Sequence, residues 1–391
     1  MSSTKESYYP ASDSSSLALR HPTPEERIEI STNTSQAWKD SLTLSMYLEE
    51  SLFMATVPLS QNDGMTVWIL VDKDLPPNHR PVLCSCESFR KRSLTSDAEG
   101  IVKENIVHGI ASVFSPLQYR RRGYTGRMMR ELSKTLSTWQ TDVSPCIGSV
   151  LYSDIGKEFY TKLGWNPNIT NNHVVLPPLC NTVRSTSVQD ISTEYLHHLC
   201  ERDEDLVRRN MATPTNDPRT RMTIIPDADH MLWHISKEEF ACKYLFHKTP
   251  TVKGAIAGSP GNRVWIVWTH RYYSHPDVEV KELENVLYIL RLVIENEQST
   301  AESVLPHQEQ DAALCAVLEA AQVEAAEWKL DVVKLWDPSP SVHNVIELNI
   351  AGCTFVEREE DSIASGLWFD EKGGAVEIAP IWLNNEHYAW C

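Results

Sequence analysis

Residues 118–129 read QYRRRGYTGRMM, and this stretch decides how the first half of the chain folds. It follows IVHGIASVFS at residues 106–115, a β-branched run that is typical of a buried strand. After Gly123, apolar residues recur at helical spacing on one face: Met128, Met129, Leu132 and Leu136. The sequence therefore predicts a strand, a glycine-containing turn and a helix, with backbone N–H groups free at the helix N-terminus.

This turn suits an anionic ligand. Gly123 and Gly126 carry no Cβ and permit close backbone approach, while the helix dipole favours negative charge. Positive charge and bidentate donors come from three neighbours, Arg120, Arg121 and Arg122. A pyrophosphate fits this arrangement. The alternative is a solvated basic cluster, because most charge runs lie on the surface. The Walker GxxxxGK[ST] and Rossmann GxGxxG patterns are absent.

The chain as a whole is acidic, with 36 Lys and Arg against 53 Asp and Glu and a formal net charge of −17. This balance disfavours a nucleic-acid partner, which requires a basic face. It is compatible with a cationic small substrate, or with a charge that serves solubility alone. No apolar run approaches the ~20 residues that span a bilayer, and the N-terminus lacks a signal-peptide core. We expect no membrane association.

The cysteines indicate the compartment. Their odd number, nine, and the lack of a secretion signal favour a reducing environment, so we expect a cytoplasmic protein. Only Cys84 and Cys86 lie close together, and no second pair completes a metal site. We therefore expect no metal.

The length of 391 residues suits two domains. Residues 1–16 are Ser-rich, and we expect a disordered tip there. Thr23, Pro24 and Glu26 form a helix-starting capping box. Strands are expected at residues 65–74, 81–91, 106–115 and 146–153, a polar loop at 92–100, and a last strand of the first domain at 173–177. The pattern breaks near residues 177–187, which predicts domains at 17–180 and 181–391. Both halves alternate strands and helices, so an α/β fold is expected, with the second half a possible degenerate copy of the first.

Two motifs carry a family resemblance. SVFSPLQYRRRGYTGRMMREL at residues 112–132 resembles motif A of the GCN5-related N-acetyltransferases, R/Q-x-x-G-x-G/A after a strand. Arg120, Gly123 and Thr125 occupy the signature positions, with Thr in place of the last Gly or Ala. SDIGKEFYTKLGW at residues 153–165 resembles motif B. Two motifs in order are more specific than either alone. WTHRYY at 268–273 and HYAWC at 387–391 resemble the fungal lysine N6-acetyltransferase branch, and the likeness covers most of the chain.

The resemblance implies a mixed central sheet, acetyl-CoA as donor and a small-molecule amine as acceptor in a ternary complex. It implies that the backbone of Val113, Phe114 and Ser115 would bond the pantetheine arm like an added strand. The pyrophosphate would lie on the loop and the helix start, at Arg120, Arg121, Arg122, Gly123, Tyr124, Thr125, Gly126 and Arg127. Ser153 and Phe159 would complete the cofactor site.

Three residues are candidates for the chemistry. Tyr160 matches the family position that protonates the coenzyme A sulfur, and unlike Phe159 it has a proton to donate; the alternative is a buried aromatic. His108 is a candidate base because its unperturbed pKa is ~6.5, although strand parity would equally turn it away from the cleft. The carboxylate of Cys391, preceded by Tyr388 and Trp390, is the other candidate, against simple packing of the last residues.

Candidate acceptor-binding residues lie in the second half. Strand alternation puts Trp268 and His270 on one face and Arg271 on the other. Aromatic rings such as Trp268 and Trp390 favour a cationic amine, and Arg271 is suited to a carboxylate. The alternative is that these tryptophans belong to the core.

The leading hypothesis is an acetyl-CoA:L-lysine N6-acetyltransferase that acts on the free amino acid. One rival changes the acceptor to a polyamine, an amino sugar or a secondary metabolite. Another is a non-catalytic acyl-CoA sensor or scaffold. The sequence makes no prediction of the oligomeric state.

Overall fold

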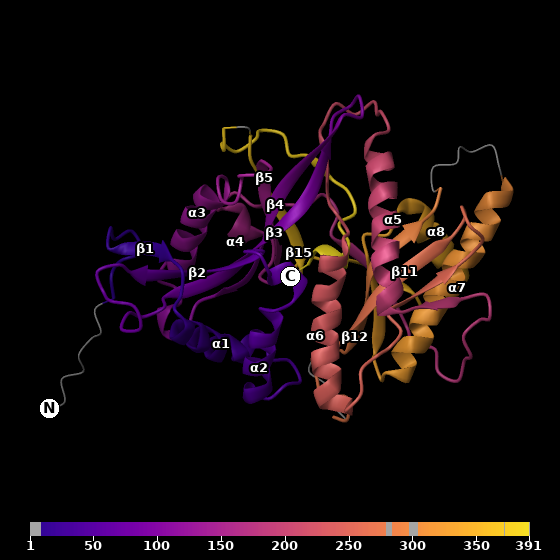
Figure 1. Ribbon diagram of the computed structural model, residues 1–391, viewed down its shortest axis with the longest axis horizontal. Coiled ribbons are helices and arrows are strands. Elements are labelled where there is room, and N and C mark those ends of the chain that lie inside the picture. The colour runs from indigo at the N-terminus through magenta and orange to yellow at the C-terminus, as the bar shows by residue number, and fades with distance from the viewer. Residues whose placement is uncertain (1–8, 279–283, 297–303, 371, 391) are drawn as a thin grey trace.

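The computed structural model describes residues 9–278, 284–296, 304–370 and 372–390. Two halves, each built on a mixed sheet, lie side by side, and the long helices α5 (Thr193–Met211) and α6 (Ala228–Phe246) stand between them (Figure 1). The C-terminal segment runs back into the region between the halves (Figure 1).

The first sheet contains nine strands within the described residues. Seven of them lie in the order β1 (Leu17–Arg20), β2 (Met65–Asp72), β3 (Cys84–Ser96), β4 (Val102–Phe114), β5 (Cys146–Ser153), β15 (Ile363–Trp368) and β6 (Asn166–Pro167). β9 (Arg221–Ile224) pairs with β3, and β16 (Ile381–Trp382) pairs with β9. The helices beside this sheet are α1 (Pro24–Trp38), α2 (Leu44–Met54), α3 (Tyr124–Leu136) and α4 (Glu158–Thr161).

The second sheet has the order β14 (Thr354–Glu357), β7 (Asn172–Leu176), β13 (Val332–Trp336), β12 (Val286–Ile294), β11 (Val264–Arg271), β10 (Gly254–Ala257) and β8 (Gln189–Ile191). The helices α7 (Val304–Glu327) and α8 (Pro340–Asn349) belong to this half. Three short 3-10 turns complete the described elements: η1 (Pro58–Ser60), η2 (Leu117–Tyr119) and η3 (His387–Ala389). Each sheet contains a parallel pair joined through a helix, β4–α3–β5 and β12–α7–β13, so the mixed α/β fold is confirmed.

The halves exchange strands. β7 pairs with β13 and β14 of the second sheet, so the prediction that residues 173–177 end the first sheet is wrong. β15, from near the end of the chain, occupies the edge of β5 instead. The predicted division between residues 180 and 181 therefore does not coincide with the division between the sheets. One apolar cluster also joins the halves, with Val107 and Val150 from the first sheet and Trp265 and Leu290 from the second.

One local prediction is confirmed, and another is wrong in part. The Thr23 side chain accepts a hydrogen bond from the Glu26 amide at 3.1 Å, and the Glu26 carboxylate accepts one from the Thr23 amide at 2.9 Å, which completes the capping box. The loop predicted at residues 92–100 is wrong as far as Ser96, because β3 continues and pairs with both β4 and β9.

The N-terminal tip is ordered where the structure describes it. The Tyr124 hydroxyl donates to the carbonyl oxygen of Pro10 at 2.5 Å, and the Tyr9 and Tyr119 rings lie 5.0 Å apart, edge to face. Residues 9–16 thus pack on the start of α3 instead of being disordered, because they bury apolar rings there. Residues 1–8 of the predicted tip lie outside the described residues.

Candidate active site

β4 and β5 separate at their carboxyl ends. Their parallel pairing stops at Ile110 and Leu151, after which β4 continues beside β3 while β5 continues beside β15. Within the described residues, no strand pairs with the last residues of β4 on the side facing β5. An extra residue on β4 causes a bulge here, and Ser112 takes a left-handed φ of 53°. The unpaired edge offers backbone donors and acceptors to an extended ligand.

The start of α3 lies beyond this edge. Gly123 is the N-cap with φ 82°, and no side chain caps the first turn, so its amides are open to a ligand. A Cβ at Gly123 would come within 2.8 Å of the Ser12 hydroxyl oxygen, which can rotate away, so it is mainly the left-handed φ that favours glycine here. Arg121 also has a left-handed φ, 60°. Thr125 and Gly126 follow in the first helical turn.

The arginines of the loop point in different directions. Arg120 donates to the carbonyl oxygen of Ser115 at 2.9 Å and lies over the Phe114 ring. Arg122 lies over the Tyr9 ring at 5.3 Å, and Arg127 pairs with Glu131 at 2.6 Å. Most of them therefore brace the loop. The side chain of Arg121 is exposed.

The candidate residues after β4 and β5 lie near the gap between these strands. Val113, Phe114 and Ser115 are half-buried. The Ser153 hydroxyl donates to the carbonyl oxygen of Gly156 at 2.8 Å, so it stabilises the turn after β5. The Phe159 and Tyr160 rings lie 5.0 Å apart, edge to face.

Tyr160 remains a proton donor at neutral pH. Burial raises the pKa of its hydroxyl, and the hydroxyl makes no hydrogen bond to any described residue. Its ring packs in the apolar cluster beneath α3.

His108 lies in the core, fully buried, on the α3 side of the first sheet. Its Nε2 is 3.1 Å from the carbonyl oxygen of Trp139, and burial lowers the pKa of the imidazole to about 4. Because side chains alternate along β4, His108 points away from the face of the sheet that packs against α2 and α6. The position argues against the hypothesis that His108 is the general base.

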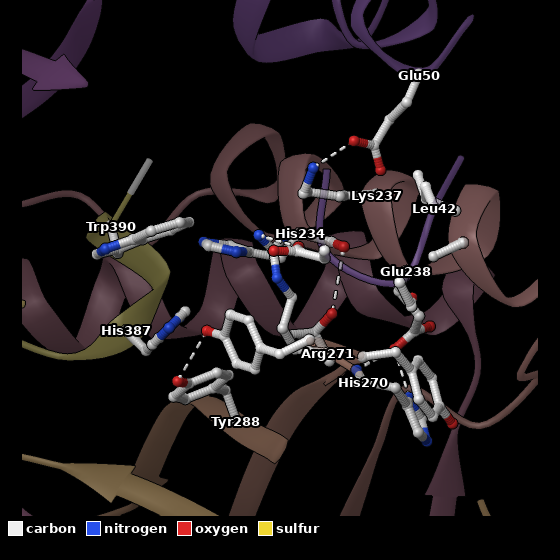
Figure 2. Close-up of a pocket in the computed structure, with 16 residues that line it drawn as sticks. Leu42, Glu50, His234, Lys237, Glu238, His270, Arg271, Tyr288, His387 and Trp390 are labelled. Carbon is white, nitrogen blue, oxygen red and sulfur yellow. Dashed lines mark hydrogen bonds and ion pairs between the residues drawn. The ribbon is translucent and has the colours of Figure 1, made fainter. Parts of the chain in front are cut away.

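A pocket of about 510 Å³ of empty space, partly open to solvent, lies between the halves (Figure 2). Its lining comes from the α1–α2 connection, α2, α6, the ends of β11 and β12, and η3. Charged and aromatic side chains dominate it: Asp40, Glu50, Lys237, Glu238, His270, Arg271, Tyr272, Tyr273, Tyr288, His387 and Trp390.

Opposite charges are paired along the pocket wall. Arg271 contacts Asp40 at 2.6 Å, and Lys237 contacts Glu50 at 2.5 Å. The Nε of Arg271 has no hydrogen-bond partner, although its charge is compensated. The predicted position of Arg271 on the acceptor side agrees with this geometry.

Trp268 and His270 share the other face of β11. Trp268 is fully buried among the apolar residues against α7 and does not line the pocket, which favours the alternative that this tryptophan belongs to the core. His270 lies between Glu238 at 2.5 Å and Glu324 at 3.1 Å. Burial lowers the pKa of His270, but these carboxylates outweigh it and raise the pKa to about 9. His270 is thus a charged link between α6, β11 and α7.

The C-terminal segment is fixed against both halves. Lys91, fully buried on β3, donates to the carbonyl oxygen of Ala389 at 2.9 Å. The Nε2 of His234 on α6 lies 3.2 Å from the carbonyl oxygen of Tyr388. These contacts bring the Trp390 ring to the pocket, 5.5 Å from the His387 ring (Figure 2). Cys391 lies outside the described residues, so the hypothesis that its carboxylate acts there stays a prediction.

Sequence reasoning missed a carboxylate beside the β4 bulge. Glu87 on β3 accepts a hydrogen bond from the Ser112 hydroxyl at 2.7 Å. Phe89, on the same face of β3, packs with residues of α2 and α6, the helices that line the pocket. Burial raises the pKa of Glu87, against the lowering effect of the Ser112 bond. Alternation was the available signal, since Ser85, Glu87 and Phe89 share one strand face.

Among the described residues, no group of three or more His, Cys, Asp or Glu side chains is arranged to hold a metal ion. Within the same residues, no helix is both long and apolar enough to cross a membrane.

Comparison with known proteins identifies the family. A model described as the LYC1 GNAT-like C-terminal domain matches residues 173–391, and so starts within β7, a strand of the second sheet. A lysine acetyltransferase of Yarrowia lipolytica is 22% identical over 297 residues, which cover 66% of this chain and 73% of the relative.

Solved structures share the fold. A GCN5-related N-acetyltransferase from Kribbella flavida superposes with a TM-score of 0.50 at 13% identity, covering 90% of this chain and 72% of that one. Saccharomyces cerevisiae N-myristoyltransferase with bound myristoyl-CoA gives 0.51 at 8% identity, covering 91% and 79%. Motif A, motif B and the matched C-terminal domain lead to one conclusion: the chain belongs to the LYC1-like GCN5-related N-acetyltransferases and is an acyltransferase.

Proposed function

We propose that this protein transfers an acetyl group from acetyl-CoA to the N6-amine of free L-lysine, by direct attack within a ternary complex. The observations that carry the proposal are the separated ends of β4 and β5 and the charged, aromatic pocket between the two halves. The Yarrowia relative, named a lysine acetyltransferase, supports this choice of acceptor.

The donor site is formed mainly by backbone. The unpaired edge of β4 at Val113, Phe114 and Ser115 would bond the pantetheine arm as an added strand. The uncapped amides at the start of α3, between Arg121 and Arg127, would hold the pyrophosphate. The unpaired strand edge and the uncapped helix start are what an extended thioester arm and a pyrophosphate require, and they support acetyl-CoA as the donor.

Glu87 is the general base in this proposal. It lies next to the β4 bulge, on the face of the sheet that turns toward α2 and α6. Its raised pKa suits removal of a proton from an ammonium group near neutral pH, since efficient bases have a pKa close to the working pH. Glu87 would take the role for which the sequence offered His108 and the Cys391 carboxylate as candidates.

Tyr160 donates a proton to the departing thiolate. The role rests on the position of the hydroxyl and on its lack of competing hydrogen bonds to described residues. Burial raises its pKa, so the proton is present at neutral pH but is also held more strongly, and transfer depends on the basicity of the departing thiolate. The tyrosine lies on α4, directly after the turn that follows β5.

Acceptor binding relies on the aromatic surface of the pocket. The Tyr273, Tyr288 and Trp390 rings offer cation–π contacts to an amine, while the Asp40 and Glu50 carboxylates are each already paired with a cation of the pocket wall. Arg271 is already paired with Asp40, so binding of a substrate carboxylate by Arg271 would compete with that pair.

An amine panel tests the proposal. The purified protein is incubated with acetyl-CoA and L-lysine, polyamines, amino sugars or other amino acids, and free thiol release is followed. We expect L-lysine to give the highest kcat/KM, with acetylation at N6 shown by mass spectrometry of the product. Release with other amines but not lysine would reject the proposed acceptor. Tight CoA binding without release for any amine would instead favour a sensor.

A further inference from the structure

Arg291 and Arg358 are each only 6% exposed. They differ in their charge partners among the described residues. Arg291 contacts the carboxylates of Asp203 and Glu386. The Arg358 side chain forms no ion pair with any described residue, and the one hydrogen bond that it makes to them runs from Nη1 to the carbonyl oxygen of Asn172 at 3.1 Å. A buried arginine is normally compensated as Arg291 is.

The donors that Arg358 leaves free share one edge of the guanidinium. Nε and Nη2 are both buried and have no partner. These two N–H groups point in the same direction and match the two oxygens of a carboxylate, which they bind side by side. Leaving them empty is costly, because buried donors lose their hydration.

Arg358 carries a charge that its surroundings compensate only at a distance. Burial lowers the pKa of Arg358 to about 10, so it is still charged at neutral pH. Asp337 and Glu357 raise this pKa from beyond ion-pair distance, and the cation Lys334 and the imidazole of His173 also lie within its electrostatic range. Burial lowers the pKa of both of these neighbours.

Arg358 does not itself line the pocket, but two aromatic rings connect it to residues that do. Its guanidinium lies 4.0 Å above the Trp336 ring, which is 4.6 Å from the His387 ring. His387 in turn stacks on Tyr288 at 3.9 Å, and both line the pocket. Trp336 also lies 5.8 Å from Tyr152, a residue of β5 beyond its pairing with β4.

We propose that Arg358 is the carboxylate-binding residue of the acceptor site and that it makes the enzyme selective for α-amino acids, held through Nε and Nη2. The inference deepens the proposed function by naming the part of the acceptor that is recognised. It assigns the carboxylate to Arg358, whose donors are free, instead of Arg271, which Asp40 compensates. Stacking on Trp336 keeps the guanidinium plane fixed for this contact.

The test compares L-lysine with cadaverine, which keeps the terminal amine and the carbon chain but lacks the carboxylate. With the unmodified protein, we expect kcat/KM for lysine to exceed that for cadaverine by about 100-fold, as for a site whose buried donors are left unpaired by the analogue. In Arg358→Gln, the value for lysine should fall by about the same factor while that for cadaverine stays within about threefold. Arg358→Lys keeps the charge but loses the two parallel donors. Its kcat/KM for lysine should lie between the values for the unmodified protein and for Arg358→Gln.

Equal losses for both amines in Arg358→Gln would indicate a structural role and overturn the inference, as would an unmodified protein that accepts cadaverine as readily as lysine. The comparison of lysine with cadaverine in the unmodified protein needs no variant, so it can overturn the inference even if Arg358→Gln fails to fold. If lysine is not a substrate, ornithine and putrescine provide the same pair. A preference for ornithine that Arg358→Gln removes would uphold the inference while rejecting lysine as acceptor.

Discussion

The donor site and the acceptor pocket are built in different ways. The donor site lies within one continuous part of the chain, β4 through α4, and presents backbone groups at a strand edge and a helix start. The acceptor pocket collects side chains from the α1–α2 connection, α6, β11 and the C-terminal segment, which lie far apart in the sequence. Donor binding should therefore depend on backbone conformation, whereas acceptor choice should depend on individual side chains.

Substitution of Gly123 by proline should have the largest effect. Gly123 has φ 82°, and proline is confined to about −65°, so the loop cannot keep its shape at the start of α3. We expect CoA affinity, measured by calorimetry, to fall by about 100-fold or more, since several amide contacts are lost together. Circular dichroism and thermal unfolding check that the variant is folded. A folded Gly123→Pro protein with normal CoA binding would place the donor elsewhere.

Glu87→Gln tests whether catalysis depends on one side chain, as the contrast with the backbone-built donor site predicts. The change keeps the shape of the residue but removes the base, so kcat should fall by about 10²- to 10³-fold. CoA affinity should be unchanged, in contrast to Gly123→Pro. Normal kcat in a folded Glu87→Gln protein would exclude Glu87 as the base.

The pH dependence of the rate gives a second measure of Glu87. A base works only when deprotonated, so kcat/KM should decline as pH falls through the pKa of Glu87, which burial raises above its usual value of 4.5. The Ser112 hydrogen bond opposes this rise, so Ser112→Ala should move the acid limb to higher pH. An acid limb that Ser112→Ala leaves in place, or moves to lower pH, would belong to another group.

Deletion of Trp390 and Cys391 should have a smaller effect, confined to the acceptor. The Trp390 ring lines the pocket, and its removal should lower kcat/KM for lysine by about 5- to 10-fold, the loss of one cation–π contact. Affinity for CoA serves as the control. A folded truncation with near-normal turnover would show that these residues only pack.

The same contrast explains which features could be predicted from the sequence. The glycine turn, the helix from Tyr124 and motif B depend on neighbouring residues, and the structure has each element where it was expected. Glu50 and Lys237 line one pocket only because α2 and α6 come together in the fold. The sequence could not show that β7 belongs to the second sheet, because a buried strand has the same apolar pattern in either sheet.

Arg121→Ala should have the smallest effect and therefore gives the sharpest comparison with Gly123→Pro. The Arg121 side chain is exposed, so its attraction for phosphate is screened by water and salt. We expect CoA affinity to fall by only about two- to fivefold, and less at high ionic strength. Calorimetry at low and high salt provides the measurement. A loss as large as that of Gly123→Pro would mean that charge, and not the backbone, holds the donor, and the contrast between the two sites would fail.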